Sequence, residues 1–412
     1  RRLTPERLRR AASALVARHE ALRLRFRRDD GRFTQRYGDV EGSFAVESVT
    51  LDRLDALPPI LGEQHRRVSV EHGPLMRLLL IETGSRQRLF IAVNHLVMDR
   101  VTLRVLLDDL DQLCRLDEQG EALRLAWTSA RFEVFSGWMN DFARRGAKAD
   151  LEFWRTQLAV PPPSTYDPLA HPGVRTEDLA TARHSLPPEE TRALRNVRMT
   201  GPDAGRAPLA TTLLTALVRT AQRQWSCGRL VVELSGSGRQ TAVHGLDLSR
   251  TVGDLHCTFP LAFDDSRSQG PAETLTAVAE RLAGVPSAGL SFEGLKYLND
   301  DPDLRQSIRQ APAPTLWFNF QGEMPTRSRS GLFSLSASAI GDVRDPGAGV
   351  RQPPLYVECT VVGGTTRIVW EYSPGRLWWT GAEIDQWMTR FRNELHHLVR
   401  RGTDVPVRQT SR

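Results

Sequence analysis

An apolar strand that runs directly into an amphipathic helix is the feature of this chain that most constrains its fold. The run Leu89–Val93 is continuously apolar, as in a buried strand, whereas residues 101–110 place leucine and valine at helical spacing. The segment that joins them is Asn94-His95-Leu96-Val97-Met98-Asp99-Arg100. Loops held between rigid elements commonly carry function, so this polar segment is the first candidate for a site.

Helical and strand patterns alternate along the rest of the chain and predict an α/β layered fold. Thr4-Pro5-Glu6 is typical of a helix start, with Thr as the N-cap and Pro in the first turn. A strand pair is predicted at 76–81 and 89–93, and a long helix at 209–225. Further strands are predicted at 230–234, 261–263, 316–320, 356–361 and 368–372.

Proline and glycine are dense between residues 159 and 183, and this density predicts a break between two subdomains. The segment includes Pro161-Pro162-Pro163 and His171-Pro172-Gly173. We therefore divide the chain into an N-terminal subdomain at 1–165, a crossing segment at 166–183 and a C-terminal subdomain at 184–412. Because the chain opens with Arg1-Arg2 and has neither an initiator methionine nor an apolar signal, we expect a piece of a longer polypeptide.

Charge and composition exclude several classes of function. The net charge is +6, but arginine is interleaved with acidic residues, so we expect no nucleic-acid binding and instead a protein partner with an acidic face. The apolar runs are too short to span a bilayer, so we expect no membrane contact and a cytoplasmic location. The cysteines lack metal-site or redox spacing, and we expect reduced thiols, no metal and no bound cofactor. They are Cys114, Cys227, Cys257 and Cys359.

The polar segment resembles the His-His-x-x-x-Asp-Gly signature of the nonribosomal peptide synthetase condensation superfamily. His95 and Asp99 match the second His and the Asp, whereas Asn94 stands at the first His and Arg100 at the Gly. Other stretches resemble the family, several of them its epimerization branch, and occur in order along the chain. They are Arg18–Arg23, Glu152–Leu158, Leu246–Gly253, Val285–Gly289, Leu295–Leu298 and Phe318–Gly322.

The resemblance implies two chloramphenicol-acetyltransferase-like subdomains in a V-shaped arrangement, with an N-terminal piece missing from the first. It implies a site at the cleft, faced by His95 and entered by a phosphopantetheine arm that a peptidyl carrier protein domain delivers. Adjoining synthetase domains are implied as further partners. Asp99 is expected to hold its loop in shape rather than to react.

Epimerization needs one base and one acid on opposite faces of the reacting α-carbon. The family supplies them from the second His of its signature, here His95, and from a Glu in a Glu-Gly-His-Gly-Arg-Glu motif. This chain reads Ser235-Gly236-Ser237-Gly238-Arg239-Gln240, so Ser235 replaces the acid and Ser237 the His. A Ser hydroxyl is a poor proton shuttle unless a base activates it. Glu233, on the same face of the strand as Ser235, is an open alternative for the acid.

Further departures from the family pattern accumulate. Arg100 places a long cation where Gly lets the arm approach, so we expect it to obstruct the route and to pair with an acid or a carbonyl. Asp254-Leu255-His256 stands at the place of a Trp-Phe-Thr. His256 beside Cys257 suggests a nucleophile, but the sequence offers no matching acid.

The degenerate motifs favour a domain that has lost catalysis. In the family, such domains include the X-domain of glycopeptide antibiotic synthetases, which recruits cytochrome P-450-type oxygenases to the carrier-bound peptide. We therefore expect a non-catalytic recruitment domain rather than an enzyme. Two alternatives remain open: an active peptidyl epimerization domain that uses His95 alone or with Glu233, and a condensation domain that forms peptide bonds with His95 as base.

Overall fold

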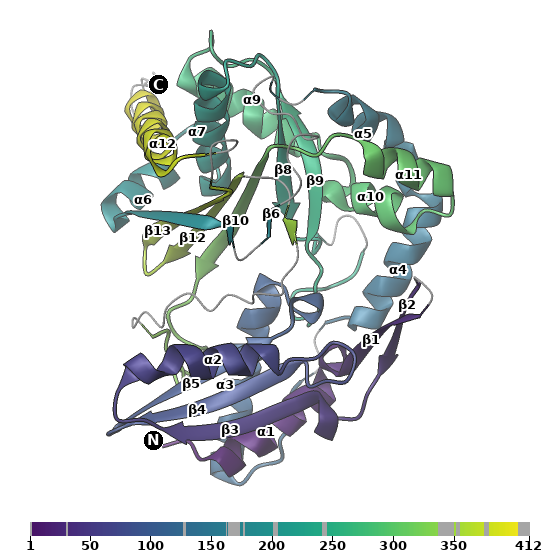
Figure 1. The fold of residues 1–412 in the computed structure, drawn as a ribbon, viewed down its shortest axis with the longest axis vertical. Helices are drawn as coiled ribbons and strands as arrows, with labels where there is room; N and C mark the ends of the chain where they lie inside the picture. The colour runs from purple at the N-terminus through teal and green to yellow at the C-terminus, as the bar shows by residue number, and fades with distance from the viewer. Residues whose placement is uncertain are drawn as a thin grey trace, which may run out of the picture. The chain divides into compact units, whose positions relative to one another are not determined.

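The computed structural model describes residues 2–29, 32–126, 129–161, 163, 174–175, 178–200, 205–240, 245–336, 350–351, 355–374 and 379–402. The chain folds into two compact units that are interleaved in sequence (Figure 1). Unit 1 comprises Arg1–Met139, Ser237–His256 and Pro325–Gly347. Unit 2 comprises Asn140–Gly236, Cys257–Met324 and Ala348–Arg412.

This division differs from the one drawn at the proline-rich break. Residues 140–165 belong to unit 2, and residues 237–256 and 325–347 return to unit 1. The physical reason is that polar contacts join distant parts of the chain: the backbone N–H of Ser330 donates to Asp111 at 3.1 Å. Residues 164–173 and 176–177, which include both prolines of the predicted crossing segment, lie outside the described residues.

Unit 1 is built from one small sheet with helices on both faces. Its helices are α1 (Pro5–Arg18), α2 (Leu57–Arg66), α3 (Arg100–Gln119) and the first part of α4 (Phe132–Arg145), with short 3-10 turns at Glu20–Arg23, Glu41–Ser43, Leu54–Ala56 and His95–Val97. Its strands are β1 (Leu24–Asp29), β2 (Arg32–Tyr37), β3 (Phe44–Thr50), β4 (Met76–Thr83) and β5 (Arg86–Val93). In the described residues the sheet order is β3-β4-β5, and β1 and β2 form a separate hairpin.

The centre of strand β4 is buried on both faces, and this explains the unbroken apolar run Leu78–Ile81. Leu78 and Leu80 pack into the core that α1 and α3 complete. Leu79 and Ile81, which alternate with them, pack against Leu61 of α2. Figure 1 shows α2 on one face of the sheet and α1 with α3 on the other. The predicted strand pair and the following helix are confirmed, and α3 is anchored firmly to the sheet.

Unit 2 is built around a larger sheet. Its helices are the second part of α4, α5 (Leu151–Leu158), α6 (Pro188–Arg195), α7 (Leu209–Gln224), α9 (Pro271–Ala283), α10 (Leu290–Glu293), α11 (Pro302–Gln310) and α12 (Gly381–Gly402), with short turns at Ala147–Asp150, Pro286–Gly289 and Gly294–Leu298. Its strands are β6 (Val174–Arg175), β7 (Ala180–Leu186), β8 (Leu230–Gly236), β9 (Cys257–Phe263), β10 (Leu316–Met324), β11 (Val350–Arg351), β12 (Leu355–Val362) and β13 (Thr365–Tyr372).

In the described residues the large sheet has the order β7-β13-β12-β10-β8-β9, with β8, β10 and β12 parallel to one another. Helix α7 packs against α12 and α9, and Arg219 of α7 donates to Glu394 of α12 at 2.7 Å, with both side chains buried. The predicted strands at 230–234, 261–263, 316–320, 356–361 and 368–372 all fall within strands of this sheet. The predicted α/β class is confirmed.

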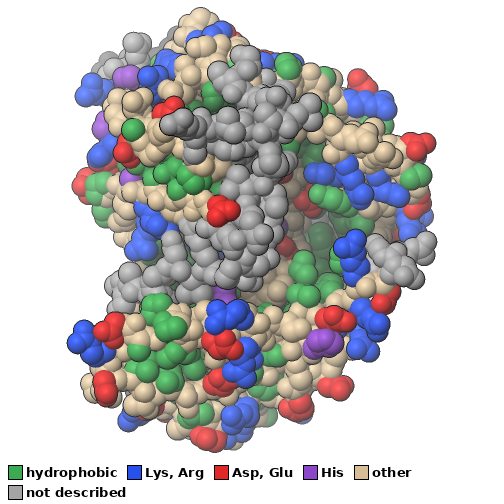
Figure 2. All heavy atoms as spheres, viewed as in Figure 1, with side chains coloured by type: hydrophobic (Ala, Val, Ile, Leu, Met, Phe, Trp, Pro, Cys, Tyr) green, Lys and Arg blue, Asp and Glu red, His purple; other side chains and the backbone are tan. Residues whose placement is uncertain are grey.

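The described surface of unit 1 carries charges of both signs (Figure 2). On the face shown in Figure 2, positive and negative side chains are interspersed over unit 1, with no stripe of one sign. The four cysteines are free thiols. In the part of the chain that the structure describes, no helix has the length and apolar character needed to cross a membrane.

Candidate functional site

The signature loop, residues 94–100, is shaped by caps at both of its ends. Asn94 donates its backbone N–H to Leu75 at 2.9 Å and accepts from the N–H of Leu96 at 3.0 Å through its side chain. Asp99 is the N-cap of α3, because its Oδ1 accepts from the N–H of Thr102 at 2.7 Å. The loop therefore begins and ends on residues whose side chains satisfy the backbone.

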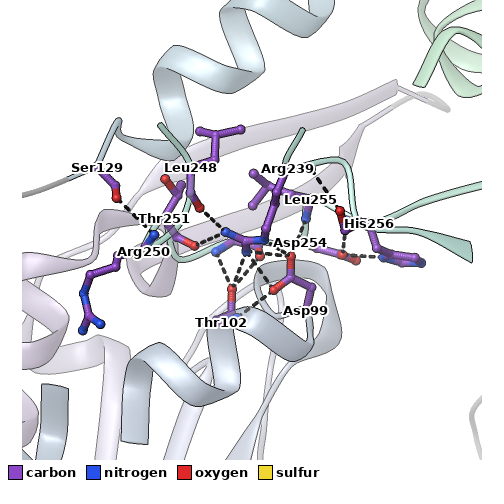
Figure 3. A network of polar contacts seen from close by, with 12 residues as sticks. Asp99, Thr102, Ser129, Arg239, Leu248, Arg250, Thr251, Asp254, Leu255 and His256 are labelled. Carbon is purple, nitrogen blue, oxygen red and sulfur yellow. Dashed lines mark hydrogen bonds and ion pairs between the residues drawn. The ribbon is translucent and has the colours of Figure 1, made fainter. Parts of the chain in front are cut away.

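Arg239 holds Asp99 in a two-pronged ion pair (Figure 3). Its Nε donates to Asp99 Oδ2 at 3.0 Å, and its Nη2 donates to Asp99 Oδ1 at 2.8 Å. Its Nη1 donates to the carbonyls of Leu248 and Thr251, at 2.5 and 2.9 Å. Both charged side chains are only 7% exposed, so the carboxylate and the guanidinium are buried together. Bidentate pairs of this kind fix orientation as well as contributing energy.

Thr102 ties a second chain segment to the start of α3. Its hydroxyl donates to the carbonyl of Gly253 at 2.8 Å and accepts from the Gly253 N–H at 3.1 Å. The N–H of Leu255 donates to Asp99 Oδ2 at 3.3 Å. A Cβ at Gly253 would overlap the ring of Phe132, so this segment passes too close to α4 for any larger residue. Residues 248–255 and the signature loop thus form one hydrogen-bonded assembly.

His95 points away from that buried assembly. Its side chain is 72% exposed, and its Nδ1 lies 3.3 Å from Asp254 Oδ2. The hydrogen bond to Asp254 raises the pKa of His95 above its ordinary value and outweighs the opposing effect of desolvation. Burial opposes ionisation of Asp254, but hydrogen bonds from His256 and His95 outweigh it and lower the pKa of that carboxyl. A His with a raised pKa is less often in the neutral form that accepts a proton at neutral pH.

The other degenerate positions, in the signature and in the second motif, are distributed over both units. Arg100 is the first residue of α3 and is half-buried, and its predicted obstruction of the arm's route stays a prediction. Ser237 is exposed in unit 1, and its hydroxyl accepts from the N–H of Arg239 at 3.5 Å. Ser235 lies in unit 2, near the end of β8.

The hydroxyl of Ser235 is buried and lacks a hydrogen-bond partner among the described residues. Ser235 sits opposite Thr258 of β9. A Cβ on the following residue, Gly236, would lie 3.0 Å from Cys257 Sγ and 3.2 Å from the Ala288 carbonyl, so the strand end is tightly enclosed. A Ser in this setting is not activated by any base within hydrogen-bonding reach in the described part of the chain.

Glu233 lies on the same strand as Ser235, two residues earlier. Burial raises the pKa of Glu233; Lys296 opposes the change and Glu293 adds to it. Glu293 itself accepts from the N–H and the hydroxyl of Thr258, at 2.8 and 3.0 Å. The environment of Glu233 therefore favours the protonated form of this carboxyl.

Sequence reasoning missed two features of this region. It treated Arg239 only as part of a degenerate motif, although this residue is the charge partner of Asp99. It also did not connect Asp254 and His256 with His95, because these residues meet only in the fold. The retained Gly-Arg pair at Gly238 and Arg239 was the one available signal, since it survives where the reactive residues of the motif are lost.

A scan against family models matches residues 1–411 to the Condensation domain. Among curated proteins, the chain is 27% identical to bacitracin synthase 3 of Bacillus licheniformis over 373 residues, which is 89% of this chain and 6% of that protein. It is 31% identical to chondramide synthase cmdD of Chondromyces crocatus over 396 residues, which is 90% of this chain and 10% of that protein. The chain thus spans a tenth or less of the length of these relatives.

Solved structures share the fold. The epimerization domain from the third module of tyrocidine synthetase B is matched with a TM-score of 0.83 and 21% identity, over 98% of this chain and 91% of that one. The X-domain from teicoplanin biosynthesis is matched with a TM-score of 0.67 and 18% identity, over 98% of this chain and 88% of that one. One fold thus serves domains with different names, so the site rather than the fold must decide the function.

Proposed function

This chain belongs to the condensation-domain family of nonribosomal peptide synthetases, and from this premise we propose that it is a catalytically degenerate member that recruits oxygenases. In this proposal it acts as an X-domain and brings cytochrome P-450-type enzymes to a peptide held on a peptidyl carrier protein. The carrier delivers the phosphopantetheine arm, and the adjoining synthetase domains supply the peptide. Such a domain needs a stable surface and no proton chemistry of its own.

The observation that carries the proposal is the state of Ser235. This residue stands where the resemblance places the catalytic acid, and its buried hydroxyl lacks a hydrogen-bond partner in the described structure. A hydroxyl without an activating base neither delivers nor accepts a proton at a useful rate near neutral pH. Loss of this group removes one of the two residues that inversion at an α-carbon requires.

The state of His95 supports the same conclusion from unit 1. Its hydrogen bond to Asp254 raises its pKa and so lowers the fraction of neutral imidazole near pH 7. In contrast, Asp99 and Arg239 keep a complete, buried ion pair. The residues that hold the loop are intact, whereas Ser235 replaces the acid and the raised pKa of His95 leaves less of its neutral, basic form.

The proposed partner surface is polar. The chain carries a net charge of +6, and its arginines are interleaved with acids, which suits charge-complementary docking of an acidic enzyme face. Recruitment of several oxygenases in turn favours a modest, exchangeable interface over an extensive apolar one. Because rim charges act mainly on association rates, binding should weaken as salt rises and the Debye length falls below about 10 Å.

The deciding experiment is reconstitution of peptide crosslinking with and without this domain. A carrier-bound peptide is presented to the oxygenases of the same biosynthetic system, either fused to the domain or as the carrier alone. We expect crosslinking to fall when the domain is deleted, and the oxygenases to bind the isolated domain at low salt. Equal crosslinking in both formats, with no binding at low salt, would overturn the proposal.

An active peptidyl epimerization domain is the second candidate, and the environment of Glu233 favours it. Burial raises the pKa of this carboxyl, so it holds a proton at higher pH than an exposed Glu and is able to donate it. In this candidate His95 is the base and Glu233 replaces Ser235 as the acid.

Deuterium uptake separates the two candidates. The domain is incubated in heavy water with a carrier-bound peptide, and exchange at the α-carbon is followed by mass spectrometry. The recruitment proposal expects exchange at background level in the native chain and in His95→Ala. Exchange above background that disappears in both His95→Ala and Glu233→Gln would move epimerization to first place. Ser235→Glu alone should not restore full exchange, because Ser237 and Arg100 remain.

A further inference from the structure

Three side chains with metal-binding atoms meet on the surface of unit 1. His95 Nδ1 lies 3.3 Å from Asp254 Oδ2, and His256 Nδ1 lies 2.5 Å from Asp254 Oδ1. One candidate ligand atom from each residue falls within 4.8 Å of those from the other two. The two imidazole rings approach edge to face, with their centroids 5.7 Å apart. A single carboxylate is thus shared between two imidazoles from distant parts of the sequence.

The fold fixes the backbone beneath all three residues. His95 follows the Asn94 cap, and its carbonyl accepts from the N–H of Met98 at 3.2 Å. Asp254 lies between Gly253, which is bonded to Thr102, and Leu255, whose N–H donates to Asp99. Figure 3 shows Asp254 and His256 extending from this anchored segment. The three side chains are therefore held close by the buried Asp99 assembly rather than by chance surface contact.

We propose that His95, Asp254 and His256 form a binding site for one divalent transition-metal ion, of the class of Zn²⁺. Two imidazoles and one carboxylate are a ligand set that such ions accept, with a further position open to water or another ligand. Metal–ligand bonds of about 2.0–2.2 Å in a tetrahedral site place neighbouring ligand atoms roughly 3.4 Å apart. The His95–Asp254 distance of 3.3 Å matches that edge, and a rotation of the His256 ring would open the shorter contact.

Exposure of the three side chains suits entry of an ion from solvent. The side chain of His95 is 72% exposed, that of His256 37% and that of Asp254 21%. The carboxylate is thus the most enclosed ligand, and the imidazoles form the open side. A bound ion would engage the lone pair of His95, so this residue would no longer be available as a base.

Two of the three ligands are departures from the family pattern. Asp254 and His256 stand where the epimerization branch is expected to carry Trp and Thr, neither of which is a usual ligand of such an ion. The ligand set therefore arises where this chain has lost the branch's residues. The inference concerns these residues alone and does not depend on oxygenase recruitment.

The competing explanation is a hydrogen-bonded His-Asp-His triad that binds no metal, and a titration distinguishes the two. The purified chain is treated with a chelator, exchanged into metal-free buffer and titrated with Zn²⁺ in a calorimeter. Titration with Co²⁺ reports the ligand geometry through its visible absorption. We expect one ion per chain, and affinity reduced at least about tenfold in His256→Ala and in Asp254→Asn.

His72→Ala is the matched control, because His72 is an exposed imidazole of unit 1 beside a carboxylate, with its Nε2 3.9 Å from Glu71. It should leave Zn²⁺ affinity unchanged. His256→Gln, which keeps side-chain size, serves as a second variant if His256→Ala alters the circular dichroism spectrum. The proposal is wrong if Zn²⁺ at about 1 mM, far above the affinity range of built sites, fails to bind, or if binding persists equally in the Asp254 and His256 variants.

Discussion

The start of α3 in unit 1 and the end of β8 in unit 2 carry the two halves of the family's motif set, and they differ in how their polar groups are satisfied. At the start of α3, both carboxylate oxygens of Asp99 accept hydrogen bonds, and Arg239 donates through each of its guanidinium nitrogens. At the end of β8, the hydroxyl of Ser235 is buried and lacks a partner among the described residues.

The difference separates structural from chemical roles in one motif set. A buried ion pair cannot lose one member without leaving the other charge unpaired, so Asp99 and Arg239 must be retained together for the fold. A residue that only transfers protons is under no such restriction once catalysis is not needed. In this chain the structural residues match the family's motifs while the reactive ones are replaced, and the following variants test whether that separation of roles holds.

The largest effect is expected from Asp99→Ala. It leaves the Arg239 guanidinium buried without its carboxylate, which costs about 3–5 kcal/mol. Hydrogen exchange resolved by mass spectrometry should show protection lost at residues 94–105 and 245–256, since the two units need not unfold together. Asp29→Ala, which breaks the exposed Arg27–Asp29 pair, is the control and should cost less than about 1 kcal/mol. Equal effects would show that the Asp99 pair is no more structural than a surface pair.

The next effect concerns His184 of β7, another polar side chain of unit 2 whose ring nitrogens lack partners in the described structure. Burial lowers its pKa to about 4, with a contribution from Arg392. Below the unfolded-state pKa near 6.5 the unfolded chain binds a proton that the native chain does not, so stability falls as pH decreases toward 4.

We expect this group to contribute a loss of roughly 1–3 kcal/mol between pH 7 and pH 4.5, measured by urea unfolding. His184→Leu should remove that part of the pH dependence, whereas His72→Leu, at an exposed site, should leave it unchanged. An identical pH dependence in native protein and His184→Leu would mean that folding does not shift the pKa of His184.

Gly253→Ala tests how tightly the Asp99 assembly is packed. The added Cβ would overlap the ring of Phe132 and shift the backbone that bonds to Thr102, which should cost about 1–3 kcal/mol. Gly137→Ala, in the exposed face of α4 with open space around its Cβ position, should instead stabilise by about 0.5–1 kcal/mol. Thermal unfolding of both variants gives the comparison, and a Gly253 variant as stable as the native chain would contradict it.

The smallest effect is expected from Ser235→Ala. Removing a buried hydroxyl that has no partner should be neutral or stabilise by up to about 1 kcal/mol. Ser43→Ala is the matched control, because the Ser43 hydroxyl accepts from Arg25 at 2.9 Å and donates to the Asp39 carbonyl at 2.6 Å. That variant should cost about 1–2 kcal/mol in chemical unfolding. If both serines cost the same, Ser235 has a partner and its role as the sign of lost catalysis fails.

Much of the fold could be predicted because it depends on local patterns. The apolar run Leu78–Ile81 of β4 and the helical spacing of apolar residues after β5 are local signals of segments that are buried in the fold. The structural role of Asp99 could be anticipated from the resemblance, and its position as an N-cap agrees with that role.

The contacts of the site could not be predicted in the same way. Arg239 reaches Asp99, and Asp254 reaches His95, across more than a hundred residues of sequence, and spacing rules act only on neighbours. The prediction of no metal rested on such spacing and therefore had no means of detecting the His95-Asp254-His256 group. The interleaved units escaped detection for the same reason, because a proline-rich segment marks a change of composition and not a change of packing partner.

The interleaving of the two units sets an order of events during synthesis. A ribosome that has released residues 1–236 has delivered α1 to α3 and the signature loop, but not Arg239. Asp99 therefore lacks its guanidinium partner until the segment that contains Arg239 has been translated. Residues 325–336 can contact Asp108 and Asp111 only after most of unit 2 has been translated. Domains usually fold as units as they emerge, N-terminal part first. In this protein unit 1 is the first to be translated, yet its last segment follows β8, β9 and β10. A recombination event that joins two synthetase genes between the codons for residues 99 and 330 must therefore keep compatible partners for contacts such as Asp99–Arg239 and Asp111–Ser330.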